Sequence, residues 1–415
     1  MSRDGRAHSF LIGRDTRESG AWIEEALTAG IAGAGGNAVS IGILPTAAVA
    51  YLVREGGFDA GIMISASHNP YHDNGIKVFS ADGYKLPDAD EARIESMILD
   101  GEGGAMDAID GARPGRSPDL IAKYHDHLVE AAGAVRFDGM RIVLDCANGA
   151  ASEVGPRVFE ALGAEVHSLS ATPDGRNINA GCGSQHPGAL QAGVVESGAV
   201  MGFAFDGDAD RCVMVDDGGG LCDGDFIMFR SALALKAAGR LGPDMVVGTV
   251  MSNLWLERSL SGEGIRLLRT PVGDKYVLEE MIRQGARIGG EQSGHVIFLD
   301  HATTGDGLLT AVMMAASVKS SGASLSAWRG SIRPCPQILL NIRVVDRPEL
   351  ESHPVIGPAI EAARRRLGAD GRVLLRYSGT EPLARVMVEA VDGSLTEKLA
   401  GELAELIRVE IGERP

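Results

Sequence analysis

Three aspartates stand at alternate positions in one short stretch, Asp206, Asp208 and Asp210, with a glycine and an alanine between them. They follow an apolar segment that ends at Phe205, which indicates a loop at the end of a buried strand. Carboxylates this close repel one another unless a cation offsets their charge, and Mg²⁺ prefers a few protein oxygens together with phosphate and water. The stretch therefore predicts a Mg²⁺ site, with a metal-free acidic turn as the alternative. A calcium-binding EF-hand is disfavoured, because the sixth loop position requires glycine and here holds Arg211.

A serine-rich turn, Ser65–Pro70 (SASHNP), follows the apolar segment Ala60–Ile64 and could expose a nucleophile. A serine hydroxyl group takes part in covalent catalysis only with a base or with a phosphoryl group already attached. His68 is adjacent to Ser67 and could act as the base, and Lys77 lies ten residues beyond the serine. No G-x-S-x-G motif surrounds the serine, which argues against an α/β-hydrolase. From these residues alone, a polar turn without chemistry is the alternative.

A third loop, Gly289–His295 (GGEQSGH), places Glu291, Ser293 and His295 among small residues. These side chains could bind the hydroxyl groups of a sugar through hydrogen bonds. An ordinary polar loop is the alternative.

A fourth loop, Arg376–Pro382 (RYSGTEP), lies between two predicted strands. Guanidinium groups bind phosphate in a bidentate manner, and free backbone N–H groups with hydroxyl groups complete such a site. The loop therefore predicts a phosphate cradle, or else a simple hairpin turn. The residues of the predicted cradle are Arg376, Ser378, Gly379, Thr380 and Arg385.

A fifth segment, Gly13–Arg17 (GRDTR), ends a predicted strand and opens a predicted helix. Helix N-termini attract anions, so the segment could support a phosphorylated nucleophile. A solvated helix cap at Asp15 or Thr16 is the alternative.

The elements that must position these loops follow a pattern that occurs three times: strand, turn, amphipathic helix, strand. Such alternation favours α/β domains with crossover helices. The three copies span residues 9–43, 141–169 and 245–268. The remaining C-terminal residues predict the order strand, helix, two strands and helix. The expected fold is three similar mixed-sheet α/β domains and a smaller C-terminal α+β domain.

Segments rich in glycine, proline or charge mark the predicted boundaries near 116–119, 217–220 and 333–336. Each predicted domain carries one of the main loops. The serine loop belongs to 1–117, the aspartate loop to 118–218, the Glu291 loop to 219–334 and the phosphate cradle to 335–415.

The composition excludes several classes of protein. The net charge is −17, with 39 basic and 56 acidic residues and no basic stripe, which argues against nucleic-acid binding. Five cysteines without a C-x-x-C motif favour neither a disulfide framework nor a zinc site. No apolar run reaches the roughly 18 residues of a membrane span, so no membrane contact and a cytoplasmic location are expected. The loose glycine motif at 33–38 follows a helix, unlike a dinucleotide fingerprint, and no P-loop motif occurs.

Taken together, five segments resemble the α-D-phosphohexomutase family, in family order and over nearly the whole chain. They are GIMISASHNPYHDNGIKVF (61–79), AFDGDADRCVMVD (204–216), RTPVGDKYV (269–277), GGEQSGHVI (289–297) and RYSGTEPLARVMVE (376–389). The resemblance implies a heart-shaped, four-domain molecule with one loop from each domain at a central cleft.

The resemblance also implies residue roles in an intramolecular phosphotransferase, which is an isomerase. Ser67 would carry the phosphoryl group, and Mg²⁺ would bind that group together with the three aspartates. His68, Lys77, Arg211 and His295 would serve catalysis, with the proton carrier left open among His68, Lys77 and His295. Glu291 and Ser293 would contact sugar hydroxyl groups, and the phosphate cradle would hold the phosphate that is not reacting.

The EQSGH form and the TEPLARVMVE ending favour a branch of the family that acts on glucosamine phosphates in bacteria. That reaction interconverts glucosamine 6-phosphate and glucosamine 1-phosphate through a 1,6-bisphosphate and serves amino-sugar nucleotide and cell-wall precursor synthesis. Mannose or glucose phosphates are the alternative substrates. A monomer or homodimer is expected.

The chain departs from the family at its start. Family members usually open with a segment similar to FGTDGIRG about thirty residues before the strand that ends in G-x-D-T-R, whereas this chain begins a dozen residues before Gly13. A missing first strand and a missing arginine near the site are therefore expected, and a weakly active sugar-phosphate-binding homologue is a further alternative. Tyr377 and Lys275 also differ from the commoner proline and arginine, but neither removes a phosphate ligand.

Overall fold

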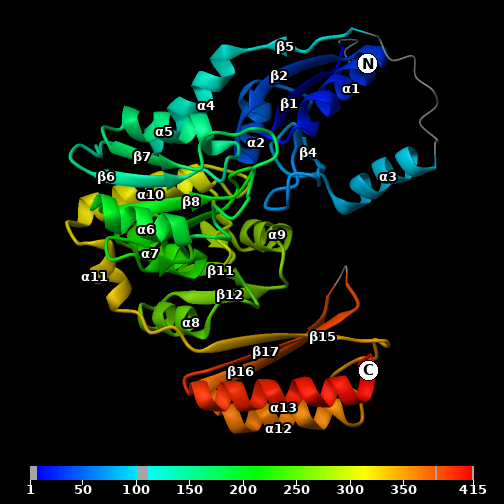
Figure 1. The fold of residues 1–415 in the computed structure, drawn as a ribbon, viewed down its shortest axis with the longest axis vertical. Coiled ribbons are helices and arrows are strands. Elements are labelled where there is room, and N and C mark those ends of the chain that lie inside the picture. The colour runs from blue at the N-terminus through cyan, green and yellow to red at the C-terminus, as the bar shows by residue number, and fades with distance from the viewer. Residues whose placement is uncertain (1–6, 101–110, 379–380, 414–415) are drawn as a thin grey trace. The chain divides into compact units, whose positions relative to one another are not determined.

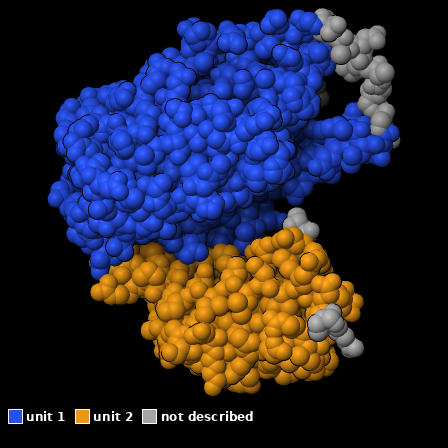
Figure 2. Space-filling view, in the orientation of Figure 1, with its two compact units in different colours: residues 1–249, 270–330 blue, residues 250–269, 331–415 orange. Residues whose placement is uncertain are grey.

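The computed structural model describes residues 7–100, 111–378 and 381–413. The chain forms two compact units, coloured separately in Figure 2. The first comprises Met1–Thr249 and Thr270–Gly330, and the second comprises Val250–Arg269 and Ser331–Pro415.

The first sheet carries the serine loop. Across the sheet its strands are β4 (Ile76–Ser80), β3 (Ala60–Ile64), β1 (Ser9–Arg14), β2 (Asn37–Ile43) and β5 (Gly115–Arg116). All neighbours run parallel except β4, which is antiparallel to β3. The helices of this region are α1 (Ser19–Gly33), α2 (Thr46–Glu55) and α3 (Asp88–Leu99) (Figure 1). The central strands are apolar because helices cover them, and Leu11 and Ile12 are fully buried.

The second sheet carries the aspartate loop. Its strands in order are β10 (Leu221–Cys222), β9 (Cys212–Asp216), β8 (Met201–Phe205), β6 (Arg141–Asp145) and β7 (Glu165–Leu169). Strand β9 runs antiparallel to β8, so the chain reverses within residues 206–211. The helices of this region are α4 (Pro118–Ala131), α5 (Ala151–Ala161) and α6 (Gly188–Ser197).

A third sheet carries the Glu291 loop. Within the first unit its strands are β11 (Met245–Thr249), β13 (Ile288–Gly290) and β14 (Val296–Phe298), with β13 parallel to β11 and antiparallel to β14. The associated helices are α7 (Gly224–Ala237), α9 (Asp274–Gln284), α10 (Gly307–Ser321) and α11 (Leu325–Gly330). The tight β13–β14 turn places residues 291–295 at one end of the sheet.

The second unit contains an antiparallel sheet in the order β15-β17-β16. Its elements are α8 (Leu254–Gly262), β12 (Arg266–Thr270, whose last residue belongs to the first unit), β15 (Gln337–Arg343), α12 (Ile356–Leu367), η1 (Gly368–Asp370), β16 (Gly371–Tyr377), β17 (Leu383–Ala390) and α13 (Gly393–Ile411). Helices α12 and α13 lie side by side in Figure 1, and their buried residues form one apolar core with alternate residues of the strands, such as Ile342 and Val386. Three mixed α/β sheets and a C-terminal antiparallel domain confirm the predicted fold class.

Candidate active site

The serine loop, which we call the nucleophile loop and define as residues 65–75, joins β3 to the antiparallel strand β4. Ser67 adopts a left-handed backbone conformation, with φ of 49°. Its N–H group donates a hydrogen bond to Ser65 Oγ over 2.9 Å, and Ser65 is buried. The Ser67 hydroxyl group in turn donates to Asp206 Oδ2 over 2.7 Å, so the structure brings together two loops that the sequence had placed in different domains.

The aspartate loop turns all three carboxylates into the protein. Asp206, Asp208 and Asp210 are buried, and each offers an oxygen within 4.8 Å of the others. Burial, with the charges of Asp210 and Asp208, raises the pKa of Asp206 well above its usual range. Burial would also raise the pKa of Asp210, but Lys77 and His295 outweigh it and hold that pKa well below the usual range.

Two of these carboxylates each have an oxygen atom that could still bind a cation. Among the described residues, the buried Oδ1 atoms of Asp208 and Asp210 have no hydrogen-bond partner, although Asp210 Oδ1 faces His295 Nδ1 at 3.6 Å. A buried carboxylate oxygen without a partner is costly, and an oxygen-binding divalent cation would satisfy it. The donor set therefore fits a hard cation such as Mg²⁺.

Lys77 lies within the same charge cluster. Its ammonium group donates to Asp208 Oδ2 over 2.7 Å and to Asp210 Oδ2 over 3.2 Å. Burial acts to lower the pKa of Lys77, but the two aspartates raise it well above its usual range, so the side chain stays charged. The structure thus places Lys77 as a counter-ion of the carboxylates. Thr46, at the start of α2, also donates its hydroxyl hydrogen to Asp208 Oδ2, and no sequence motif marks it as a site residue.

The two predicted histidines occupy different positions. His68 Nδ1 lies 3.3 Å from Ser67 Oγ, and burial together with Arg211 lowers the pKa of His68. His295 is 3 % exposed, and its Nε2 atom accepts a hydrogen bond from the Gly305 N–H group. Burial opposes protonation of His295, but Asp210, 3.6 Å away, contributes most to raising its pKa.

Arg211 and the Glu291 loop complete this side of the cluster. The backbone N–H group of Arg211 donates to Asp206 Oδ1 over 3.1 Å, and the buried Nε atom of the Arg211 side chain has no partner in the part of the chain that the structure describes. Glu291 Oε1 accepts a hydrogen bond from the Gly273 N–H group, and Ser293 is exposed.

Gly294, with φ of 98°, packs so closely on Cys212 that a Cβ atom would lie 2.3 Å from the Cys212 carbonyl oxygen. This close approach fixes the loop beside the aspartates.

The predicted phosphate cradle lies on the face of the second unit's sheet opposite the apolar core formed with α12 and α13. Arg376 and Arg385 are directly opposite each other on β16 and β17, and Asn341 is opposite Arg385 on β15. Like charges in this register repel each other, and burial with Arg385 lowers the pKa of Arg376. Arg385 Nη2 donates to Ser378 Oγ over 3.4 Å and to the Glu381 carboxylate over 3.3 Å, while its buried Nε atom has no partner among the described residues. The row formed by Arg376 and Arg385 fits an anion. The predicted residues Gly379 and Thr380 lie outside the described residues.

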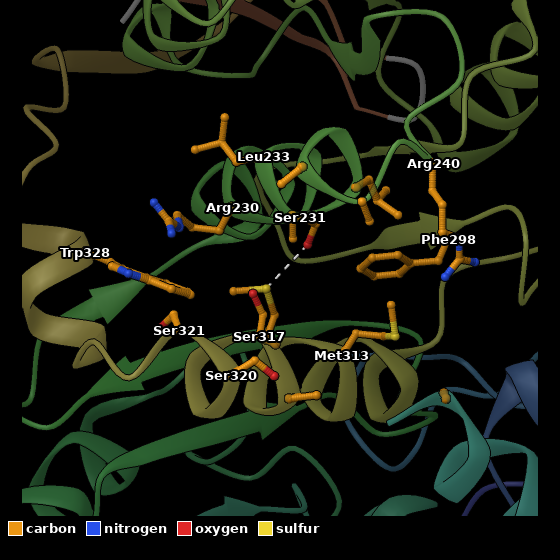
Figure 3. Close-up of a pocket in the computed structure, with 17 residues that line it drawn as sticks. Arg230, Ser231, Leu233, Arg240, Phe298, Met313, Ser317, Ser320, Ser321 and Trp328 are labelled. Atoms are coloured by element: carbon orange, nitrogen blue, oxygen red, sulfur yellow. Dashed lines mark hydrogen bonds between the residues drawn. The ribbon is translucent and has the colours of Figure 1, made fainter. Parts of the chain in front are cut away.

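One concave site lies away from these loops. A cavity of about 640 Å³ opens between α7, α10 and α11, and none of the predicted site residues that the structure describes lines it (Figure 3). Its wall includes Arg230, whose guanidinium carbon lies 3.6 Å from the centre of the Trp328 ring, and Ser231, which donates to Met314. The side chains that could carry out chemistry therefore lie on the loops and not in this cavity.

Family models match almost the whole chain. Those of phosphoglucomutase/phosphomannomutase alpha/beta/alpha domains I, II and III match residues 1–103, 122–219 and 223–334, and that of the C-terminal domain matches 339–406. This chain belongs to the phosphohexomutase family. It is thus a phosphohexomutase, an isomerase, as the five sequence segments had predicted.

Individual relatives agree with the family models. The phosphohexomutase is 48 % identical to a phosphoglucosamine mutase of Streptomyces griseus, over 98 % of this chain and 91 % of the relative. A solved phosphoglucomutase/phosphomannomutase family protein from Burkholderia thailandensis superposes with a TM-score of 0.80 at 23 % identity, covering 99 % of this chain and 92 % of that chain. An N-acetylphosphoglucosamine mutase of Aspergillus fumigatus, solved with GlcNAc-6P and magnesium, has a TM-score of 0.69 at 20 % identity over 88 % and 92 %. These two structures are similar in fold.

Two general features of the phosphohexomutase accompany this assignment. All five cysteines are buried free thiols. Among the described helices, none combines the length and apolar character that a membrane crossing requires.

Proposed function

We propose that this phosphohexomutase is a phosphoglucosamine mutase that interconverts glucosamine 6-phosphate and glucosamine 1-phosphate through a phosphorylated Ser67. The observation that carries the mechanism is the 2.7 Å hydrogen bond from Ser67 Oγ to Asp206 Oδ2, beside the other two buried aspartates. The high identity to a phosphoglucosamine mutase over nearly the full length supports the substrate.

In the first half-reaction, the bond between Ser67 Oγ and phosphorus breaks, and a bond forms between phosphorus and the 1-oxygen of glucosamine 6-phosphate. The proton of that sugar hydroxyl group ends on Ser67 Oγ. His68 is proposed to deliver it; its Nδ1 atom lies 3.3 Å from Oγ, and its lowered pKa favours the neutral ring, which can both accept and donate a proton.

In the second half-reaction, the 6-phosphoryl group of glucosamine 1,6-bisphosphate returns to Ser67, and the serine proton passes to the 6-oxygen. Glucosamine 1-phosphate is left. Arg376, Ser378 and Arg385 are proposed to bind the phosphate that is not reacting, and Glu291 and Ser293 to bind sugar hydroxyl groups.

Asp206, Asp208 and Asp210 would hold Mg²⁺. When bound, the ion offsets the charge of the carboxylates and polarises the phosphoryl group. Lys77 neutralises part of the same charge through its contacts with Asp208 and Asp210.

The test combines intact-mass analysis with turnover. A fraction of the wild-type protein should carry about 80 Da of additional mass from one phosphoryl group. Ser67→Ala should lose both the additional mass and turnover, while Ser96→Ala, at an exposed position of α3, should keep both. Turnover that persists in Ser67→Ala would refute the covalent mechanism.

A substrate panel tests the specificity separately. The ratio kcat/KM should be highest for glucosamine phosphates, measured beside mannose and glucose phosphates under the same conditions. A higher value on mannose 1-phosphate would replace the proposed function with that of a phosphomannomutase/phosphoglucomutase.

A further inference from the structure

We propose that Arg17 is a positioning residue for the nucleophile: its guanidinium group holds the nucleophile loop in the shape that directs the Ser67 hydroxyl group at the aspartate loop. The inference rests on the proposed function, in which Ser67 carries the phosphoryl group. Arg17 is assigned no contact with the substrate.

All five N–H bonds of the Arg17 guanidinium group have an acceptor within the protein. The Nε atom donates to Asp15 Oδ2 over 2.9 Å. The other four donate to backbone carbonyl groups of the nucleophile loop: Ser67 O at 2.9 Å, Asn69 O at 2.8 Å, Asp73 O at 3.0 Å and Pro70 O. Arg17 is 1 % exposed, so water does not compete for these bonds. One side chain therefore satisfies carbonyl groups along most of the loop.

Asp15 links Arg17, through Ser65, to the backbone N–H group of Ser67. Its Oδ2 atom also accepts a hydrogen bond from Ser65 Oγ over 2.6 Å, and Ser65 Oγ accepts one from the Ser67 N–H group. Both backbone polar groups of Ser67 are thus bound, directly or through Ser65, to the buried pair of Arg17 and Asp15. This arrangement explains how Ser67, which is not a glycine, is held at a φ of 49°.

Asn179 approaches the same carbonyl groups from the second sheet's loops. Its side-chain Nδ2 atom donates to Ser67 O over 2.9 Å and to Asn69 O over 3.1 Å. Two residues from different parts of the chain therefore bind one short stretch of backbone. Because their donors are directed at the carbonyl group of Ser67 itself, these residues have a positioning role and do not merely fill space.

Lysine cannot replace arginine in this role. The planar guanidinium group presents five donors in a fixed geometry, whereas an ammonium group offers three donors around a single point. Arg17→Lys keeps the charge beside Asp15 but cannot reach all of the carbonyl groups. We expect kcat to fall by about 10²-fold, because a nucleophile misplaced by about 1 Å loses that much rate. The KM for the sugar phosphate should change little, because Arg17 contacts only backbone and Asp15.

The matched control is Arg329→Lys. Arg329 also donates to a fully buried aspartate, Asp216, but it lies on α11, away from the nucleophile loop. Both lysine variants should lower the melting temperature, and only Arg17→Lys should lower kcat with KM preserved. Equal effects of the two variants on kcat would show that Arg17 acts through stability alone and would overturn the proposal.

Asn179→Gly keeps the proposal testable if Arg17→Lys fails to fold. Glycine tolerates the φ of 59° at this position while removing the two donors. Its kcat should fall in the same direction as that of Arg17→Lys, and unchanged kcat would overturn the inference. In the double variant, the loss in kcat should be smaller than the product of the single losses, because both residues act on Ser67.

Failure of this inference differs from failure of the proposed function. If Ser67→Ala abolishes turnover while a folded Arg17→Lys turns over normally, Ser67 is the nucleophile and Arg17 does not position it. If Ser67→Ala keeps turnover, the proposed mechanism itself is wrong.

Discussion

The hydroxyl group of Ser67 donates a hydrogen bond to Asp206 Oδ2 over 2.7 Å, although 139 residues separate them in the sequence. This contact joins the loop of the first sheet to the loop of the second. A phosphoryl group on this serine would stand beside three buried carboxylates, so the site requires positive charge. Lys77 supplies part of it, and the buried Oδ1 atom of Asp208, which has no hydrogen-bond partner among the described residues, could bind a cation that supplies the rest.

Mg²⁺ should stabilise the folded protein through the aspartate loop. A cation that binds only the folded state at 100 times its Kd adds about 2.7 kcal/mol to the free energy of unfolding. Calorimetry in Mg²⁺ and in EDTA should therefore give a higher Tm with Mg²⁺. Asp208→Asn should lose most of that difference, while Asp126→Asn, an exposed carboxylate on α4, should keep it. An equal Mg²⁺ effect in both variants would rule out the aspartate loop as the binding site.

Removing Lys77 should make the protein depend more strongly on the cation. Lys77→Met leaves Asp208 and Asp210 without their shared ammonium group, and hydrogen bonds to charged groups are worth roughly 1.5–3 kcal/mol. We expect a loss of stability of about that size in EDTA and a smaller loss in Mg²⁺. Lys123→Met, which removes a surface ion pair with Glu55 outside this charge cluster, serves as the control. A loss for Lys77→Met that is the same with and without Mg²⁺ would contradict the counter-ion role.

The row of Arg376 and Arg385 should bind a free anion. Inorganic phosphate between the two guanidinium groups would relieve their repulsion, so it should raise the Tm of the wild type. Arg385→Gln should weaken this effect and raise the KM for the sugar phosphate, by roughly tenfold for a loss of about 1.4 kcal/mol of binding. Arg343→Gln, which removes an exposed charge of the same sheet, should leave both quantities unchanged. Equal behaviour of the two variants would exclude this row as the anion site.

Asp306 should make the stability depend on pH. Burial raises its pKa from 3.8 to about 6 in the folded protein, although the Leu309 N–H group and Tyr124 donate hydrogen bonds to it. The folded state therefore binds this proton more tightly than the unfolded state does. The contribution of Asp306 to the free energy of unfolding should thus fall by roughly 3 kcal/mol as the pH rises from about 4 to about 6.

Asp306→Asn should remove this component of the pH profile and keep the N-cap of α10, because asparagine also caps helices well. Urea unfolding at several pH values between 4 and 7, compared with the wild type, measures the difference. Asp392→Asn changes the exposed N-cap of α13 in the same way and should leave the profile unchanged in this range. Parallel profiles for the wild type and Asp306→Asn would show that the buried carboxyl group does not titrate as expected.

The sequence alone determined the local features of this protein. The apolar segments before Ser65 and Asp206 predicted strands that end in functional loops. This prediction was possible because the hydrophobic pattern of a strand and the small polar residues of a turn are properties of a few neighbouring positions. The repeated strand–helix pattern predicted the three α/β sheets. The first copy, expected over residues 9–43, consists of β1, α1 and β2, which together span Ser9–Ile43.

The tertiary structure alone decided which distant side chains meet. Thr46 contacts Asp208 at a sequence separation of 162 residues, and Asn179 contacts Ser67 at a separation of 112 residues. Neither Thr46 nor Asn179 belongs to a sequence motif that indicates a functional site. The role of Lys77 likewise follows from the antiparallel pairing of β4 with β3, which sets it opposite Met63 and within reach of the aspartates. Sequence patterns report local preference, whereas the charge and hydrogen-bond partners of a buried group depend on what long-range packing places beside it.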